Sequence, residues 1–196
     1  MPQLTVEEYL GSRYVLNPLR LWDCDRPVNA SAADLFTTAE RARGMRQPPV
    51  YVLNHSRHNF RQRTTQADLE QIEDWTDRAA RRMYEGVGLG PKDVDIFNPY
   101  DGYAPMAQFF LEAFQWHGVK RVDAFAFYAG DIRVEGPHPL CSSGGNLGNG
   151  RTRTAMYTDC IEQLRGTASA RQVRVRTETA LGGIHHAKQW RLDHVR

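Results

Sequence analysis

The sequence predicts a layered α/β domain with an at least partly parallel sheet, because helix-like and strand-like segments alternate along it. Its 196 residues, 41% hydrophobic and 24% charged, suffice for one buried core with a small appendage. The formal net charge of +2 gives no reason to expect a nucleic acid partner. No run approaches the about 20 apolar residues that cross a bilayer and no apolar signal core begins the chain, so a cytoplasmic location is expected.

Three helices are predicted where apolar residues recur at three- and four-residue steps. Thr65 can cap the first helix, with Asp68 three residues on, and Gly86 can end it. The second helix is expected to stop at Gly118 and the third at Gly166. Their apolar faces comprise Leu69, Ile72, Trp75, Ala79 and Met83, then Met106, Phe109, Phe110, Ala113 and Phe114, and finally Met156, Tyr157, Cys160, Ile161 and Leu164. Stripes of this kind are typical of core surface.

Several short runs read as strands between and before these helices. They are Ala32 to Ala39, Val50 to Leu53, Val94 to Phe97, Val122 to Phe127, and an alternating run from Val173 to Thr179. Asp34 is an awkward charge for a central strand. Residues 1–30 read as an irregular segment with no core of its own, and the polar tail from His185 to Arg196 is expected to fray outside the sheet.

The cysteines and histidines give little sign of metal or thiol chemistry. Cys24, Cys141 and Cys160 are odd in number and lack CxxC spacing, which argues against a disulfide framework or a zinc ribbon and favours packing roles. The pairs His55 with His58 and His185 with His186 lack an acidic or cysteine ligand at metal spacing. The sequence therefore predicts no metal site.

One candidate site is the stretch Asn98 to Tyr103, where a predicted strand ends and a helix begins. Side chains at the carboxyl end of a strand, facing the amino end of a helix, often form the sites of α/β proteins. The alternative is structural: Asn-Pro and Asp-Gly are turn signals, and Asp101 can simply cap the following helix.

A second candidate is the glycine-rich stretch Ser142 to Gly150. Glycines let the backbone approach a ligand closely and turn successive amide hydrogens toward an anion, so the stretch is a candidate substrate-binding cradle. Its glycines are Gly144, Gly145, Gly148 and Gly150, and they match neither a P-loop nor a dinucleotide fingerprint. His138, just ahead of the stretch, either lines the same pocket or is a plain loop histidine.

These stretches carry a resemblance to a known family. The order DVDIFNPYDGYAPMAQFFLEAFQWHG, FYAGDIRVEGPHPLCSSGGNLGNGRTRTA and DCIEQLRGTASARQVRVRTETALGG resembles the carboxyl-terminal domain of thiolases, above all the lipid-transfer (sterol-carrier-protein-X) type and its steroid side-chain relatives. The segment DCDRPVNASAADLFTTAERAR looks like the last strand region of the family's amino-terminal domain. The resemblance implies a remnant of the amino-terminal half over residues 1–60 and a thiolase-like carboxyl-terminal domain, with a mixed sheet and packed helices, over 61–196.

The resemblance also implies which residues would do chemistry. The family's reactive cysteine belongs to the half that is missing here, and its histidine position falls on Arg151. The family's polar motif falls on Tyr100, Asp101, Gly102 and Tyr103, and some members with a Tyr-Asp pair there cleave β-hydroxyacyl-CoA thioesters by retro-aldol chemistry with a partner protein. The candidate catalytic residues are therefore Tyr100, Asp101, Tyr103 and Arg151.

The expected function is C–C bond cleavage or formation next to a coenzyme A thioester, of the acyltransferase or retro-aldol type, with a coenzyme A thioester as substrate and no other cofactor. The partner expected is an amino-terminal thiolase half or an accessory subunit in a homo- or hetero-oligomer. Two alternatives stay open: a non-catalytic acyl- or protein-binding module, and a degenerate thiolase fragment.

Overall fold

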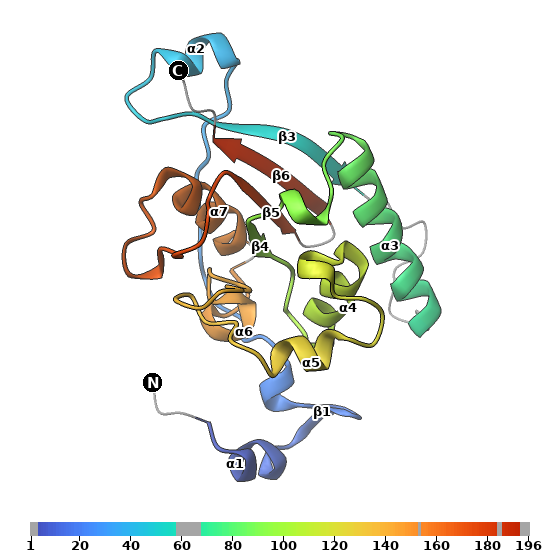
Figure 1. Cartoon of the computed structure of the whole chain (residues 1–196). Helices are drawn as coiled ribbons and strands as arrows, with labels where there is room; N and C mark the ends of the chain where they lie inside the picture. The colour runs from blue at the N-terminus through green and yellow to red at the C-terminus, as the bar shows by residue number, and fades with distance from the viewer. Residues whose placement is uncertain (1–3, 58–67, 153, 184–185, 193–196) are drawn as a thin grey trace.

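The computed structural model describes residues 4–57, 68–152, 154–183 and 186–192. At its centre lies a four-stranded sheet in the order β3 (Val50–Arg57), β6 (His186–Leu192), β5 (Thr179–Gly183), β4 (Ile96–Asn98) (Figure 1). β4 and β5 are parallel, whereas β6 is antiparallel to both β5 and β3. The predicted α/β class with a mixed sheet is thereby confirmed. Among the described residues, no helix is both long and apolar enough to cross a membrane.

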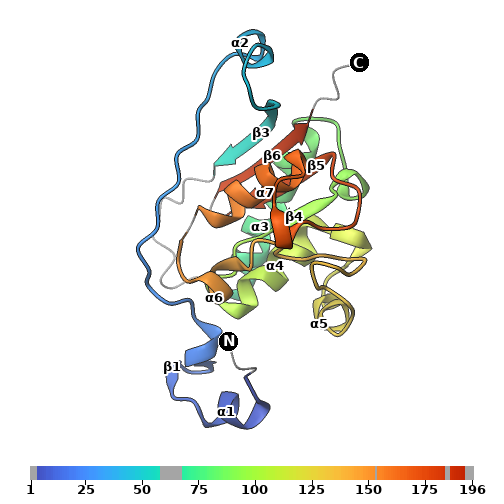
Figure 2. The ribbon, with the colours of Figure 1, turned by 90° about the vertical axis from the view of Figure 1, so that its left-hand side faces the viewer.

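Helices cover both faces of this sheet, and each face has its own part of the core. The long helices are α3 (Leu69–Glu85), α4 (Ala104–Phe114) and α7 (Ala155–Arg165). Because neighbouring residues of a strand point to opposite faces, Ile96 and Ala180 pack in the cluster formed with α7. Phe97 and Leu181 pack in the cluster formed with α3 and α4. Figure 2 shows α7 and α3 on opposite sides of the sheet.

The predicted carboxyl ends of two helices are confirmed, whereas the amino end of α3 differs from the prediction: Asp68, expected inside the helix three residues after a cap at Thr65, is itself the N-cap. The carboxylate of Asp68 caps α3 by accepting a hydrogen bond from the N–H of Gln71 at 2.8 Å. Gly86 and Gly166 follow the last turns of α3 and α7, as expected. The cap proposed at Thr65 lies outside the described residues.

The region after α4 differs from the prediction in two ways. α4 ends at Phe114, before the expected Gly118, because Gln115 takes a left-handed φ of 50° and begins the 3-10 turn η3 (Trp116–Gly118). The strand predicted over Val122 to Phe127 is wrong: the short helix α5 (Ala124–Tyr128) occupies it. Phe127 packs against Trp116, and the run has no neighbouring strand to pair with in the described sheet. Its apolar side chains therefore form the packing face of a helix and not of a strand.

The carboxyl-terminal part of the chain holds two further corrections. The strand predicted from Val173 begins only at Thr179, as β5, and a 3-10 turn η4 (Ser169–Arg171) precedes it. The tail was expected to fray, yet residues 186–192 form β6, between β3 and β5. Backbone pairing on both sides, with no apolar signature, explains why the sequence concealed this strand. Two further short helices lie earlier in the chain: η2 (Pro91–Asp93), before β4, and α6 (Gly145–Asn149), before α7.

Residues 4–49, hereafter the N-terminal segment, run along one side of the described residues from 50 to 192, hereafter the sheet domain (Figure 2). Their elements are short: α1 (Val6–Gly11), β1 (Tyr14–Leu16), β2 (Leu19–Arg20), η1 (Leu21–Asp23) and α2 (Ala39–Arg43). The strand predicted from Ala32 to Ala39 is wrong, since residues 25–38 form no regular element and have no strand beside them within the described chain. Asp25 is the one buried residue of the segment.

The predicted division at residue 60 assigns β3 to the remnant of another half. In the structure, β3 pairs along its length with β6 and so belongs to the same sheet as β4 and β5. The division of the chain into two domains itself stays a prediction.

Candidate functional site

The two candidate stretches meet at the carboxyl end of β4, and Asp101 joins them. Its Oδ1 accepts a hydrogen bond from the N–H of Asn146 at 2.6 Å, and its Oδ2 accepts one from the N–H of Leu147 at 3.3 Å. Both donors lie at the start of α6, so Asp101 caps α6. The alternative in which Asp101 caps the following helix is wrong, because α4 begins without a side-chain capping bond.

Glycines make this close approach sterically feasible. A Cβ on Gly145, whose φ is +60°, would lie 1.8 Å from Oδ2 of Asp101. A Cβ on Gly102 would lie 2.0 Å from the hydroxyl of Tyr100, so the Tyr100 side chain lies directly against the backbone at Gly102. The two loops therefore need glycine at both positions.

The amide hydrogens that the cradle would offer to a ligand are largely engaged within the chain. The N–H of Gly144 donates to the carbonyl of Cys141 at 2.8 Å, and that of Gly145 donates to Oγ of Ser143 at 3.1 Å. The N–H of Gly148 donates to the carbonyl of Gly144 at 3.1 Å. The glycines thus shape the loop, and the cradle for an anion stays a prediction.

Arg151, directly after the glycine-rich stretch, forms an ion pair with the N-terminal segment. Its Nε and Nη2 donate to Oδ1 of Asp25 at 2.8 and 2.6 Å. The N–H of Asp25 donates to the carbonyl of Gly102 at 3.0 Å, and the N–H of Arg151 donates to the carbonyl of Arg26 at 2.7 Å. Residues 24–26 therefore bond both to the first candidate stretch and to Arg151, which directly follows the second.

The groups around this ion pair shift the pKa of Arg151 and that of Asp101. The Asp25 carboxylate raises the pKa of Arg151, first through their hydrogen bonds and also through its charge, with smaller contributions from Tyr100 and Tyr103. Burial raises the pKa of Asp101, against the lowering effect of the two backbone hydrogen bonds, and the charge of Asp25 raises it further. Tyr103 is 41% exposed, so this cluster reaches the surface. The structure thus brings together all four predicted catalytic residues.

Beneath the site lies a buried polar network that the sequence analysis did not identify. The carboxylate of Asp159 accepts hydrogen bonds from Ser142 at 2.6 Å and Asn98 at 3.0 Å, and forms an ion pair with Arg171. Asn98 in turn accepts a hydrogen bond from the N–H of Ser143 at 3.1 Å. The network ties the end of β4 to the start of the glycine-rich loop and to α7. Its signal was Asp159, a charge beside Cys160 on the apolar face of the third predicted helix.

His138 lies in a separate aromatic cluster. Its ring centroid is 4.4 Å from that of His117 and 5.5 Å from that of Phe127, beside η3 and α5. Its predicted role in substrate binding stays a prediction. Among the described residues, no group of three or more His, Cys, Asp or Glu side chains is arranged to hold a metal ion, and His58 and His185 lie outside them.

The three thiols are placed for packing. Burial raises the pKa of Cys160 to about 12 and that of Cys141 well above its usual value. Burial also raises the pKa of Cys24, with the charges of Asp23 and Asp25 acting in the same direction. A thiol with a raised pKa carries little thiolate at neutral pH and is a poor nucleophile.

Comparison with known proteins matches residues 56–189 to the family described as "Thiolase C-terminal domain-like". The chain is 31% identical to an acetyl-CoA acetyltransferase of Methanothermobacter thermautotrophicus, over 87% of this chain and 45% of that protein. It is 29% identical to a 17-hydroxy-3-oxo-4-pregnene-20-carboxyl-CoA lyase of Mycobacterium tuberculosis, over 84% of this chain and 44% of that one.

Among solved structures, the fold resembles an "Ltp2-ChsH2(DUF35) aldolase", with a TM-score of 0.76 and 21% identity over 97% of this chain and 52% of that chain. The chain thus spans about half the length of the relatives it matches. The resemblance inferred from the sequence is confirmed: this chain belongs to the thiolase C-terminal domain-like family.

Proposed function

We propose that this chain contributes one half of a composite site that breaks or forms a C–C bond next to a coenzyme A thioester by retro-aldol chemistry. The observation that carries the proposal is the link between the stretch Asn98 to Tyr103 and Arg151, because Asp25 donates its N–H to the carbonyl of Gly102 and pairs through its carboxylate with Arg151. Relatives named as a carboxyl-CoA lyase and as a steroid side-chain-cleaving aldolase of Thermomonospora curvata support this reaction class.

Tyr100 is the proposed proton acceptor. A free phenol has a pKa near about 10, and a neighbouring cation favours its ionised form. The phenolate takes the proton of the β-hydroxyl group, a carbonyl forms at that carbon, and the bond to the α-carbon breaks. The electron pair passes to the thioester enolate, whose oxygen Arg151 stabilises before the α-carbon is protonated.

Asp101 serves this site as a positioning residue. It is buried, and both of its oxygens accept hydrogen bonds from the start of α6. Its carboxylate therefore fixes the loop that leads to Arg151, which places the guanidinium relative to Tyr100.

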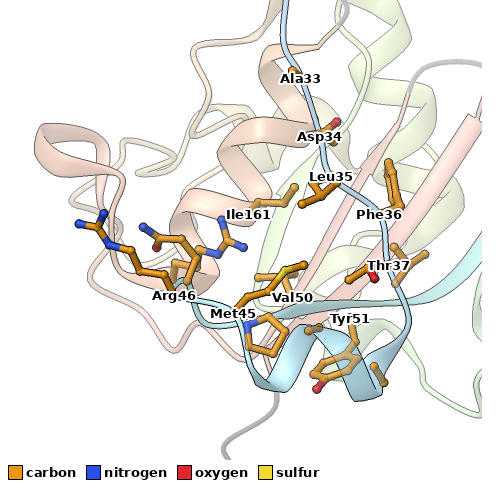
Figure 3. Close-up of a pocket in the computed structure, with 16 residues that line it drawn as sticks. Ala33, Asp34, Leu35, Phe36, Thr37, Met45, Arg46, Val50, Tyr51 and Ile161 are labelled. Carbon is orange, nitrogen blue, oxygen red and sulfur yellow. The ribbon is translucent and has the colours of Figure 1, made fainter.

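The partner half is proposed to cover a groove along the N-terminal segment. The groove has a volume of about 610 Å³, and Figure 3 shows Leu35, Met45, Val50 and Ile161 lining it from the N-terminal segment, β3 and α7. Leu35 is 80% exposed and Phe36 66% exposed, in a strand-like sequence that pairs with no described strand. An extended segment of this kind offers backbone groups and apolar side chains to the edge of another sheet.

The test compares Tyr100→Phe with the wild type in the assembled complex, by following carbonyl product release from a β-hydroxyacyl-CoA thioester. We expect kcat to fall by roughly 100-fold or more, the usual contribution of a positioned acid–base group. The matched Tyr14→Phe change, on the exposed β1, should leave kcat unchanged. An undiminished kcat in Tyr100→Phe would contradict the proton-transfer role of Tyr100. Cleavage activity in a chain that light scattering shows to be monomeric would contradict the need for a partner.

A second candidate is a non-catalytic acyl-binding module, favoured by the engagement of the loop amides and of Asp101 within the chain. This candidate predicts saturable binding of a coenzyme A thioester by the complete assembly without any turnover. Calorimetry together with product analysis separates the two candidates.

A further inference from the structure

The feature that the proposed chemistry leaves unused is the carboxylate of Asp25. Its side chain is 0% exposed, whereas that of Arg151 is 35% exposed. Both hydrogen bonds from the guanidinium, from Nε and Nη2, reach the same oxygen, Oδ1. Oδ2 is buried without a hydrogen-bond partner among the residues that the structure describes. A buried carboxylate in this arrangement depends on a cationic partner, which among the described residues is Arg151.

The backbone around Asp25 is fixed from both sides. Cys24 forms a β-bridge with Tyr103, and the N–H of Asp25 donates to Gly102, so one candidate loop holds it. From the other loop, the N–H of Arg151 donates to the carbonyl of the next residue along the segment. A Cβ on Gly150 would lie 2.3 Å from Cγ1 of Val28, which shows how closely the segment packs there.

The geometry orients the guanidinium. Because its Nε–Nη2 edge faces Asp25, the third nitrogen, Nη1, is turned away from the carboxylate. A planar guanidinium bonded along one edge cannot rotate freely, whereas an unpaired arginine side chain of this exposure would extend into solvent. The orientation of Arg151 therefore depends on a residue 126 positions away in the sequence.

We infer that Asp25 is a positioning residue that holds Arg151 beside Tyr100 and Tyr103 with Nη1 available to an incoming thioester or enolate oxygen. Asp25 itself is too deeply buried to touch a substrate. The inference rests on the proposed function for the role of Arg151, and it stands on the ion pair for the geometry. The segment expected to be a mere remnant thus completes the site.

The direct test measures the Nε–H resonance of Arg151 by ¹⁵N–¹H NMR in the chain of 196 residues, assigned by its loss in Arg151→Lys. We expect slow hydrogen exchange in the wild type and exchange about tenfold faster or more in Asp25→Asn, the size expected for a weakened charge-assisted hydrogen bond. Asp25→Glu, which keeps the charge, should restore part of the protection. If Asp25→Asn fails to fold, the exchange rate at Arg151 is compared instead between the wild type, Asp25→Glu and Asp23→Asn.

Asp23→Asn is the matched control. It removes the same charge two residues away, but Asp23 bonds the hydroxyl of Tyr9 and the N–H of Arg20. Its effect on the Arg151 resonance should be negligible. Equal exchange rates at Arg151 in the wild type and in the Asp25 variants would overturn the inference.

A kinetic cycle in the complete assembly separates positioning from general stability. Asp25→Asn should lower kcat by about tenfold with little change in KM, because a misplaced charge acts mainly on the transition state. In the Arg151→Lys background the same change should add nothing, since Asp25 acts through Arg151. Multiplicative losses would overturn the inference. If the assembly shows no cleavage, the proposed function fails while the NMR result still decides the placement of Arg151.

Discussion

The sheet domain and the N-terminal segment bury their apolar side chains to very different degrees. In the sheet domain, Phe97 packs with its ring centroid 5.6 Å from those of both Phe114 and Trp116, and all three are at most 2% exposed. In the N-terminal segment, Leu16 and Leu35 are 70% and 80% exposed. One region supplies its own core, whereas the other carries apolar residues whose burial needs something outside the described chain. The segment is anchored to the sheet domain by polar bonds instead.

The largest effect that tests this comparison is expected at Phe97. Phe97→Ala removes a fully buried ring, and we expect the free energy of unfolding to fall by about 3–5 kcal/mol. Leu35→Ala should change it by less than about 0.5 kcal/mol, as for other exposed positions. Urea denaturation of the isolated chain measures both. A large loss at Leu35 would show that the segment has a core of its own.

The buried network beneath the site is expected to give the next largest effect. Asp159→Ala leaves the buried donors of Ser142 and Asn98 without their acceptor and removes one of the two carboxylates that pair with Arg171, so we expect a loss of about 3 kcal/mol. Glu162→Ala is the matched control, because Glu162 pairs with the same Arg171 but is 42% exposed. It should cost less than about 1 kcal/mol. Equal losses in chemical denaturation would mean that burial of Asp159 is not what matters.

A glycine pair tests how tightly the site is joined to the sheet domain. Gly145→Ala places a methyl group against Asp101 at a positive φ, and we expect a loss of about 2 kcal/mol. Gly148→Ala lies in the same helix with open space around it and should be neutral or stabilising by up to about 1 kcal/mol. Thermal unfolding distinguishes the two. The same change in stability for both variants would contradict the idea that close packing of Asp101 against α6 stabilises the fold.

The smallest effect concerns pH. Loss of water around the ring lowers the pKa of His117 below 6.5, and His138 lowers it further. A lowered pKa in the folded chain means stability that is present above pH 6.5 and lost as pH falls through the folded value. Chemical denaturation at several pH values should show this decline in the wild type and less of it in His117→Gln. His55→Gln, on β3, should leave the decline in place; equal slopes in all three would exclude His117.

The sequence predicted best what depends on local periodicity. The helices α3, α4 and α7 follow from apolar residues on one face, and glycines at Gly86 and Gly166 mark two of their ends. The strand-like run from Ala32 to Ala39 was wrong for the opposite reason: a strand exists only where a neighbour can pair with it. β6 was not predicted because backbone pairing with β3 and β5 holds it in the sheet, and such pairing leaves no pattern in the sequence of the strand itself.

The candidate site also combines residues that local motifs predicted with one that only the tertiary structure reveals. Family motifs located Tyr100, Asp101, Tyr103 and Arg151, and the structure brings them together, but their catalytic roles stay predictions. Asp25 could not be identified, because it lies in a stretch with no periodicity and meets Arg151 only through the tertiary fold. Contacts between residues so far apart leave no local pattern to read.

The position of β6 has a consequence for the order in which the molecule assembles during synthesis. β3 is translated early, yet its described partner in the sheet, β6, emerges more than a hundred residues later, with Val50 opposite Leu192. Until β6 is made, β3 lacks its partner in the sheet, so a ribosome-bound chain holds β3 as an unpaired strand edge. Within the described four-stranded sheet, the last strand along the chain thus pairs with the first.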